Sequence, residues 1–324
     1  MSNRNVVLYY AWSRPGEIGA PLEVIENRFP TLFESRRMAY PRFEDVSDAS
    51  LFDQGVGGFL DHVQKRNFAA FVELARAVTG RPAVEIERVT QAGATPLDAG
   101  LLDDADTLII ISFDSLRTGQ AAGEAEVSAV RRFLAVPDHL VFVCPHHDIG
   151  DVPELPHDAR LQRQLADFLH HGDRAIPPQQ GFGGFARSLL AGLGVPVENR
   201  FGLRPAARED GTPAPIEIDA ALDRLHLLKG VESFNLHPHL PQLERLDEAN
   251  GKLDVLARQK IDLSAPPHPF TSERTTFDAL LQSRPDAFPG VLLVSDTTLF
   301  SSTAGGVDNL KRLWTNVLGR PVRA

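Results

Sequence analysis

The residues best suited to chemistry lie in one short segment, Cys144-Pro145-His146-His147-Asp148. A cysteine beside a histidine can act as a nucleophile, because the imidazole stabilises the thiolate. Imidazole and carboxylate groups can instead bind a divalent metal ion such as zinc, iron or manganese. We therefore expect catalytic roles for Cys144, His147 and Asp148 and metal binding by His146 and His147. The competing interpretation of Cys144 is a small, inert, buried side chain.

Two further carboxylates stand beside polar residues, at Asp114, which is followed by Ser115, and at Asp296. Together with Asp148 they could form a cluster for acid–base chemistry on a sugar or another small polar metabolite, because neighbouring like charges raise the pKa of one member. Asp and Ser are also preferred residues at helix N-termini. Capping is the favoured role for Asp296, and for Asp114 capping and catalysis are equal alternatives.

Ser115 and Asp296 are also candidate ligand-binding residues, and three other residues could contact a ligand. Trp12 and Arg14 follow an early apolar run, and an aromatic ring and a guanidinium there could stack on and clamp an anion. Core packing of Trp12 and a surface ion pair of Arg14 are the competing interpretations. Gly183 lies in the run 181–184 before a helical segment, where backbone amides could bind a phosphate or carboxylate, or simply begin the helix.

The chain holds eleven histidines, so the metal prediction has more candidates than the first segment supplies. His237 and His239 are separated by one residue, which places both imidazoles on one side of an extended segment. His170 and His171 precede Gly172, as expected for cations near a helix C-terminus, and most histidines are expected at such ends or on the surface. The further candidate ligands are His157, His170, His171, His237, His239, His268 and Asp296.

The elements that must position these groups are short apolar strands. Residues 107–112 and 140–144 are rich in β-branched side chains and stop abruptly at polar residues, and a helical pattern over 121–134 lies between them. This is the pattern of a βαβ unit, whose two strands are parallel. The candidate residues therefore gather at the carboxyl ends of neighbouring strands, where open α/β sheets bind ligands.

Alternation of strands and helices along the chain predicts an α/β fold with a doubly wound, mostly parallel sheet. We expect one domain over 1–324, with an insertion at 11–58 that caps the site and an α+β elaboration at 203–289 before the final strand. The strands are predicted at 5–10, 84–89, 107–112, 140–144, 253–257 and 291–295, and the helices at 59–78, 121–134, 159–169, 184–193 and 310–318.

Three pieces of the chain resemble a known superfamily. They are residues 106–134, then 141–148 followed by 191–195, and finally 290–300 followed by Asn309 and Asn316. Together they look like the class I glutamine amidotransferase-like superfamily, and more narrowly its branch of trehalose-utilisation (ThuA-like) proteins and gliding-motility and intraflagellar-transport domains. In that branch a late strand ends in a "GDSSFLS"-like turn, which residues 295–301 resemble, with Ser295 in place of the glycine.

The resemblance implies a flavodoxin-like sheet and a family that ranges from enzymes to scaffold modules. Its catalytic members carry a nucleophilic cysteine in a Gly-x-Cys-x-Gly elbow. Here the corresponding segment is Phe142-Val143-Cys144-Pro145-His146, in which neither elbow glycine is present. This departure argues against amidotransferase activity.

Composition excludes several classes of partner. The net charge is −10, the pI is about 5.6, and no basic run of useful length exists. Nucleic acid and anionic membrane surfaces are therefore not expected as partners, because both are bound through clustered positive charge. One cysteine excludes an internal disulfide, and no apolar run approaches the roughly 20 residues of a membrane span. We expect a cytoplasmic protein, with homo-oligomerisation left open.

Two functions fit these features. The first is a small polar metabolite-binding protein or enzyme with hydrolytic or proton-transfer chemistry, since the site residues are polar and no redox-cofactor fingerprint is present. A divalent metal ion is its candidate cofactor. The second is a non-catalytic interaction module that uses an amidotransferase-like fold as a platform, which the missing elbow glycines favour.

Overall fold

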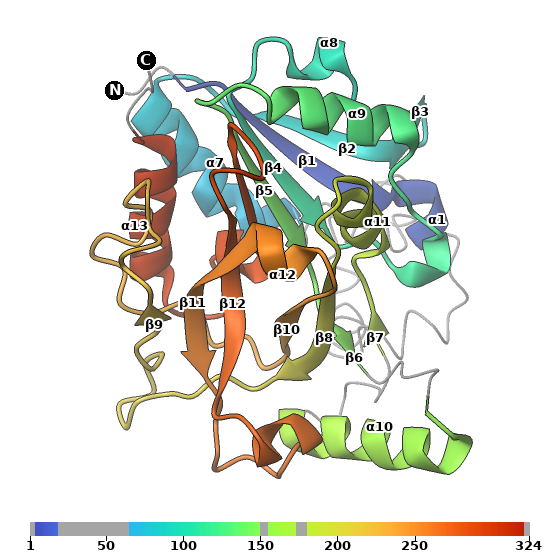
Figure 1. The fold of residues 1–324 in the computed structure, drawn as a ribbon, viewed down its shortest axis with the longest axis vertical. Coiled ribbons are helices and arrows are strands. Elements are labelled where there is room, and N and C mark those ends of the chain that lie inside the picture. The colour runs from blue at the N-terminus through green and yellow to red at the C-terminus, as the bar shows by residue number, and fades with distance from the viewer. Residues whose placement is uncertain (1–3, 19–64, 150–154, 173–179, 321–324) are drawn as a thin grey trace, which may run out of the picture.

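Five parallel strands form the centre of the main sheet (Figure 1), in a computed structural model that describes residues 4–18, 65–149, 155–172 and 180–320. Their spatial order is β2-β1-β4-β5-β13. Numbered among themselves they read 2-1-3-4-5, which is the flavodoxin-like order. The α/β, mostly parallel prediction is confirmed. The strands are β1 (Val6–Ser13), β2 (Val84–Thr90), β4 (Thr107–Ser112), β5 (Leu140–Pro145) and β13 (Val291–Ser295).

Antiparallel strands extend this sheet at both edges to nine strands in the described residues. β12 (Thr276–Ser283) pairs with β13, β11 (Leu253–Lys260) pairs with β12, and β9 (Glu217–Ile218) ends that side. β3 (Gly93–Ala94) pairs with β2 at the opposite edge. The final strand β13 therefore returns to the centre of the sheet, and the 203–289 segment supplies the strands beyond it.

A second, smaller sheet lies next to the carboxyl ends of the main strands. Its order is β10-β8-β6-β7. β8 (Val197–Leu203) and β10 (Leu240–Arg245) form its long antiparallel pair, while β6 (Asp148–Ile149) and β7 (Gln180–Gly181) are two residues each. β6 follows β5 after only two residues, so this sheet holds the chain at the point where His146 and His147 leave the main sheet.

Helices cover both faces of the main sheet (Figure 1). α7 (Arg66–Thr79) and α13 (Val307–Leu318) pack together on one face. α8 (Ala99–Leu102), α9 (Glu124–Phe133) and α11 (Gly184–Gly192) lie on the other. α10 (His157–His171) packs against β8, away from both layers. The short remaining segments are α1 (Arg14–Ile18), α12 (Ala249–Lys252), η2 (Leu116–Thr118), η3 (Pro269–Ser272) and η4 (Thr297–Phe300).

The alternation of side chains along β1 shows why the central strands are continuously apolar. Leu8 and Tyr10 enter the core beneath α7 and α13, whereas Val7 and Tyr9 enter the core beneath α9 and α11. Successive side chains of a strand point to opposite faces, so a strand covered on both sides must be apolar throughout. Each fully buried aliphatic side chain contributes roughly 1.5–3 kcal/mol to stability.

Several predicted elements need correction. The strands at 197–203, 240–245 and 276–283 were not predicted from the sequence. β1 continues to Ser13, three residues past its predicted end, and α1 follows directly. The rest of the predicted insertion, and the first residues of the predicted 59–78 helix, fall within 19–64 and so outside the described residues.

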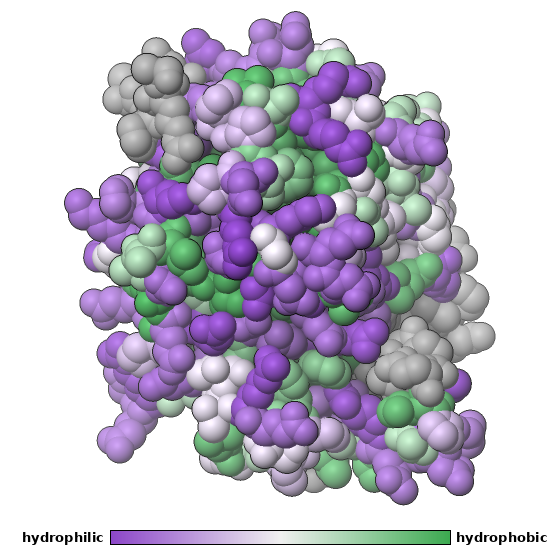
Figure 2. All heavy atoms as spheres, viewed as in Figure 1, coloured by the Kyte–Doolittle hydropathy of each residue, from purple (hydrophilic) through white to green (hydrophobic). Residues whose placement is uncertain are grey.

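The surface gives two broad observations. The face shown in Figure 2 is mostly hydrophilic, with apolar residues in smaller areas between the charged ones. Among the described residues, no helix is both long enough and apolar enough to cross a bilayer.

Candidate functional site

The ends of β5 and β13 bring an imidazole and a carboxylate together. The two strands are parallel neighbours, so His146 after β5 and Asp296 after β13 emerge at the same edge. The Nδ1 atom of His146 lies 3.1 Å from Oδ2 of Asp296 and 3.2 Å from Oγ1 of Thr297. The His146 ring also stacks on Phe113, with 4.6 Å between the ring centres. Both predicted strand-end residues therefore lie in one constellation.

Four more imidazoles surround this pair. His147 follows His146 in the chain, His237 and His239 come from the segment before β10, and His171 ends α10. Ring centres are 4.0 Å apart for His146–His147, 5.1 Å for His146–His237, 5.2 Å for His147–His239 and 4.5 Å for His171–His239. We call these five residues the histidine cluster. The predicted one-sided placement of His237 and His239 fits their 5.2 Å separation.

Burial keeps most of this cluster uncharged at neutral pH. Removal from water lowers the pKa of His171 to about 4 and that of His237 to about 3. It also lowers the pKa of His147 and His239 well below the usual histidine value. Mutual repulsion between imidazolium groups acts in the same direction on all four. The expectation that most histidines are at the surface is thus wrong for this cluster, and His171 is no cation at a helix end.

Asp296 keeps its negative charge within this apolar setting. Burial by itself raises the pKa of a carboxyl group, but His146, His237 and the hydrogen bonds from Thr298 outweigh it, so the pKa of Asp296 is lowered. Its Oδ1 accepts from the backbone amide of Thr298 at 2.8 Å, which caps η4. Asp296 therefore performs the predicted capping and also holds the imidazole of His146.

Three ring nitrogens of the cluster have no hydrogen-bond partner among the described residues. They are Nδ1 of His147, Nε2 of His171 and Nε2 of His239, and each is buried. Buried polar atoms are nearly always paired in folded proteins, so three exceptions in one cluster require a physical reason. Across the described ranges, no group of three or more His, Cys, Asp or Glu side chains is arranged, as it stands, to hold a metal ion.

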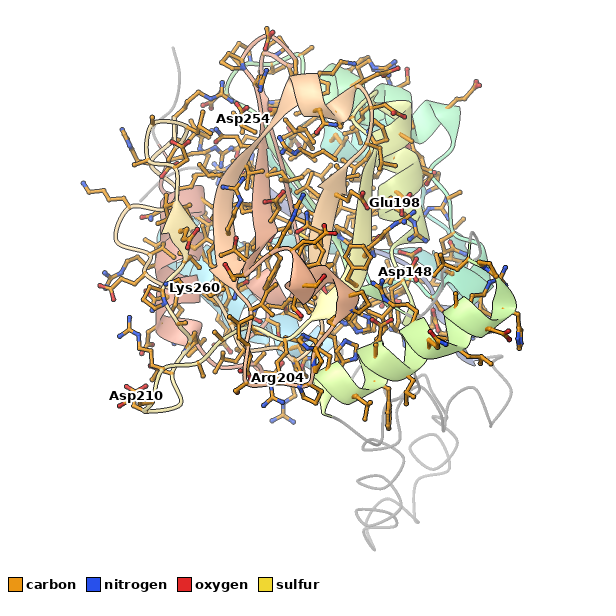
Figure 3. The ribbon with its side chains drawn as sticks, turned by 60° about the horizontal axis from the view of Figure 1, so that its bottom comes forward. Asp148, Glu198, Arg204, Asp210, Asp254 and Lys260 are labelled. Atoms are coloured by element: carbon orange, nitrogen blue, oxygen red, sulfur yellow. The ribbon has the colours of Figure 1, made fainter. Side chains whose placement is uncertain are left out.

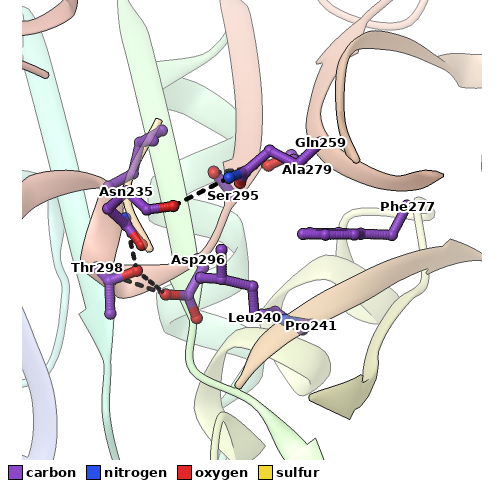
Figure 4. A pocket seen from close by; sticks show the side chains of 10 residues that line it. Asn235, Leu240, Pro241, Gln259, Phe277, Ala279, Ser295, Asp296 and Thr298 are labelled. Carbon is purple, nitrogen blue, oxygen red and sulfur yellow. Dashed lines mark hydrogen bonds between the residues drawn. The ribbon is translucent and has the colours of Figure 1, made fainter. Parts of the chain in front are cut away.

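A small pocket adjoins the cluster through Asp296 (Figure 4). Its free volume is about 10 Å³, which is roughly the space that one water molecule needs. Asn235 Nδ2 donates to Thr298 Oγ1 at 3.0 Å, and Gln259 Nε2 donates to the carbonyl of Asn235 at 3.1 Å. Hydroxyl, amide and carboxylate groups on an otherwise apolar wall suit a small polar ligand. The lining residues are Asn235, Leu240, Pro241, Gln259, Phe277, Ala279, Ser295, Asp296, Thr298 and Leu299.

Asp114, Ser115 and Gly183 build the start of α11. The Oδ2 atom of Asp114 accepts from the amide of Phe185 at 2.9 Å, its carbonyl accepts from Gly183, and burial raises the pKa of the carboxyl group to about 6. Gly183 has φ +84°, and a Cβ there would lie 3.0 Å from Asn199. Ser115 is buried beside them. The geometry matches the capping alternative for Asp114 and the plain helix start for Gly183.

Asp148 lies on β6 of the small sheet (Figure 3), and its carboxylate pairs with Arg187 of α11. Its Oδ2 accepts from Arg187 Nη1 at 2.6 Å, and Glu198 lies 3.4 Å from the same nitrogen. Asp114 contacts the α11 backbone, Asp148 contacts Arg187, and Asp296 contacts His146. In the described structure the three carboxylates therefore do not form the predicted cluster, since each contacts a different partner. β6 directs Asp148 toward α11.

Cys144 is a core residue. Its side chain is fully buried within β5 on the same face as Ile111 and Phe142, and burial raises the pKa of the thiol well above its usual value. A nucleophilic cysteine needs a stabilised thiolate and access to substrate. The structure gives Cys144 neither, which corrects the predicted catalytic role and fits the absence of the elbow glycines.

Trp12 and Arg14 are both engaged by Glu87 of β2. Trp12 Nε1 donates to Glu87 at 3.0 Å, and Arg14 donates through Nε and Nη2 at 2.9 and 2.6 Å. Burial raises the pKa of Glu87, but hydrogen bonds from Arg14, Lys65 and Trp12 outweigh it and bring the value to about 2. The predicted ligand clamp is instead an internal ion pair. Trp12 packs in the core, as its competing interpretation holds, whereas Arg14 forms an ion pair that is mostly buried and not at the surface.

His170, His268 and His157 lie outside the cluster. His170 and His268 both join α10 to the loop around η3 through fully paired rings, and His157 is exposed at the start of α10. The site is thus built by His146, His147, His171, His237, His239 and Asp296.

The chain matches no protein-family model, and none of the curated proteins matches it.

Proposed function

We propose that this protein is an enzyme acting on a small polar metabolite by proton transfer or hydrolysis, with the histidine cluster and Asp296 as its site. The observation that carries the proposal is the pairing of His146 with an ionised Asp296 at the carboxyl ends of β5 and β13. This edge is where open α/β sheets bind ligands.

The His146–Asp296 pair has the geometry of an oriented base. A carboxylate that accepts from Nδ1–H fixes the tautomer in which Nε2 carries the lone pair, and it stabilises the imidazolium formed when Nε2 takes a proton. Stacking on Phe113 restricts the ring further. In this proposal His146 removes a proton from water or from a substrate hydroxyl, and Asp296 is the positioning residue.

The adjoining pocket supports a polar ligand rather than an apolar one. Asn235, Gln259 and Thr298 present amide and hydroxyl groups next to the carboxylate of Asp296 (Figure 4). Groups of this kind orient a ligand, whereas Phe277 and Leu299 supply apolar contact. Hydroxyl and carboxyl groups of a ligand match this mixture, and a sugar or a hydroxy acid would need the pocket to widen beyond its present volume of about 10 Å³.

The test is hydrolysis of three probes, p-nitrophenyl acetate, p-nitrophenyl phosphate and p-nitrophenyl glucoside, together with thermal shifts from a panel of sugars and hydroxy acids. We expect His146→Ala and Asp296→Asn each to lower kcat/KM for the active probe by roughly 100-fold or more, the usual share of a positioned base. His157→Ala and Asp158→Asn, both exposed on α10, serve as controls.

Turnover that survives His146→Ala in a folded protein would contradict this proposal. The absence of both turnover and any ligand-dependent thermal shift would also contradict it, and would leave the interaction module as the working function. Circular dichroism and melting curves of each variant separate loss of chemistry from loss of fold.

A further inference from the structure

The two groups of buried histidines in this molecule differ in whether all their ring nitrogens are hydrogen-bonded. His170 donates from Nδ1 to the carbonyl of Pro266 at 2.8 Å and accepts at Nε2 from the amide of Arg204 at 3.1 Å. His268 pairs with Asp167 through Nε2 and with the amide of Phe270 through Nδ1. Both rings are completely satisfied by protein atoms. The histidine cluster, by contrast, leaves one ring nitrogen unpaired on each of His147, His171 and His239.

The unpaired nitrogen of His171 lies close to the backbone of β8. Nε2 and Cε1 are the ring atoms nearest Gly202, and Nε2 has no hydrogen-bond partner among the described residues. A buried imidazole nitrogen without a partner can direct its lone pair at an ion.

Gly202 also keeps the space beside this nitrogen open. A Cβ at this position would lie 3.2 Å from Nε2 of His171 and 2.1 Å from a methyl group of Ile149. The backbone there has φ +51°, which favours glycine. The close approach of the β8 backbone to the ring therefore depends on this residue.

The spacing of the rings agrees with coordination of one ion. A metal that binds two imidazoles at about 2.0–2.1 Å with a tetrahedral angle holds their ring centres about 5 Å apart. The His239 ring lies 5.2 Å from that of His147 and 4.5 Å from that of His171. Since the nitrogens do not yet converge, the rings must turn about χ2, which is a broad, soft torsion for histidine.

We infer that His147, His171 and His239 form a binding site for a divalent transition-metal ion of the zinc class. His237 is not a ligand, because its Nδ1 accepts from the amide of His239 at 3.3 Å, so a neutral His237 carries its proton on Nε2. Three imidazole ligands without a thiolate are typical of catalytic zinc sites, which keep a fourth position for water or substrate.

The electrostatics of the cluster suit such an ion. All three imidazoles are buried, at 1%, 3% and 2% exposure for His147, His171 and His239. The carboxylate of Asp296, next to His146, supplies nearby negative charge. The inference deepens the proposed function, since it names the cofactor of the same site, but it rests on the unpaired nitrogens and not on the His146–Asp296 pair.

The experiment is zinc binding by untagged full-length chain, loaded with zinc chloride, dialysed and measured by elemental mass spectrometry, with cobalt substitution read from its visible spectrum. We expect one zinc per chain, a tetrahedral cobalt spectrum and a higher melting temperature with zinc. His147→Ala, His171→Ala and His239→Ala should each weaken zinc binding by more than the roughly 10- to 100-fold that loss of an outer-shell partner costs.

Two variants serve as matched controls. His268→Gln removes a buried but fully paired imidazole, and His157→Ala removes an exposed one; both should keep the zinc. If an alanine variant does not fold, the corresponding glutamine variant replaces it, and the wild-type cobalt spectrum alone decides coordination. Failure of the wild type to retain zinc, or retention by a folded His147→Ala/His239→Ala double variant, overturns the inference.

The two proposals fail in different ways. Turnover that requires His146 and Asp296 but persists in chelator-treated, zinc-free protein would support the proposed function and contradict the inferred metal site. Stoichiometric zinc without turnover or ligand binding would support the metal site and contradict the proposed enzymatic function.

Discussion

At the scale of single residues, partners on distant segments decide what a side chain does. Arg14 was a candidate ligand clamp by type, yet Glu87 on the neighbouring strand binds it in two places. Cys144 was a candidate nucleophile by its neighbours, yet its position within β5 turns it into the core. Residue types and spacing can name candidates, but they do not contain these tertiary partners.

The acid stability of the protein depends on Glu87. The folded pKa of this carboxyl is about 2, against an ordinary value of 4.5. A lowered pKa stabilises the folded state above pH 4.5, and this contribution is lost as pH falls toward 2, amounting to roughly 2–4 kcal/mol for a buried group. Glu87→Gln should remove this part of the pH dependence, as measured by urea unfolding between pH 7 and 2.5. An unchanged pH profile would contradict the assignment.

The ionisation of Asp114 should lower the stability of the folded state, whereas that of Glu87 raises it, and it should do so at higher pH. Burial raises the pKa of this carboxyl from 3.8 to about 6, so its ionisation destabilises the folded state as pH rises from about 4 through 6. Asp114→Asn keeps an acceptor for the amide of Phe185 and removes the charge. We expect the variant to lose the decline in stability between pH 4 and 6 and to match or exceed the wild type at pH 7, by urea unfolding at each pH. A variant that follows the wild-type profile would be evidence against this shift.

At the scale of elements, strands with a continuous apolar run could be predicted from the sequence, whereas strands with an irregular pattern of apolar residues could not. The 107–112 run matches β4 at both ends, because five consecutive apolar or β-branched residues end at the polar Ser112. β8 was missed because Val-Glu-Asn-Arg-Phe-Gly-Leu alternates only loosely. β12 buries Asp278 and Gln282, whose polar side chains bond to neighbouring segments and break the apolar pattern. The histidine cluster was equally hidden, because α10, β5 and the segment before β10 meet only in the folded chain.

The bend of β8 at Gly202 should be intolerant of any side chain. Gly202→Ala adds a Cβ that would meet Ile149 at 2.1 Å in a backbone with φ +51°. Gly211→Ala is the matched control, since Gly211 has φ +80° but nothing within 4 Å of its Cβ. We expect the control to cost about 1 kcal/mol of unfolding free energy and Gly202→Ala to cost roughly 3 kcal/mol or more, by urea unfolding. Equal losses would show that the clash is absent.

At the scale of the whole molecule, both ends of the described chain lie side by side near the amino ends of the central strands (Figure 1). Arg320 is buried and donates to Thr107 Oγ1 at 2.8 Å and to the carbonyl of Asp106 at 2.9 Å. Arg4 donates to the carbonyl of Arg320 at 3.2 Å and pairs with Asp138. The doubly wound arrangement followed from the alternation of elements, but this closure did not, because it depends on residues more than 200 positions apart.

Loss of this closure should destabilise the whole fold. Arg320→Ala removes a buried guanidinium that donates to the Thr107 hydroxyl and to the carbonyls of Asp106, Asp138 and Val317. We therefore expect a loss of roughly 3–5 kcal/mol, as for other broken buried charge networks. Arg312→Ala, which removes an exposed guanidinium on α13, should change stability by less than about 0.5 kcal/mol. Melting temperature and urea unfolding would test both, and equal effects of the two variants would refute a structural role for Arg320.

The position of β13 has a consequence for how this chain is made. β13 lies between β5 and β12 in the interior of the nine-stranded sheet, although it begins only at residue 291. Until that segment leaves the ribosome, β5 and β12 have no partner on their facing edges, and unpaired strand edges invite association with other chains. Assembly of the sheet must therefore wait for the last tenth of the sequence, and until then the nascent chain carries two strand edges that only β13 can pair.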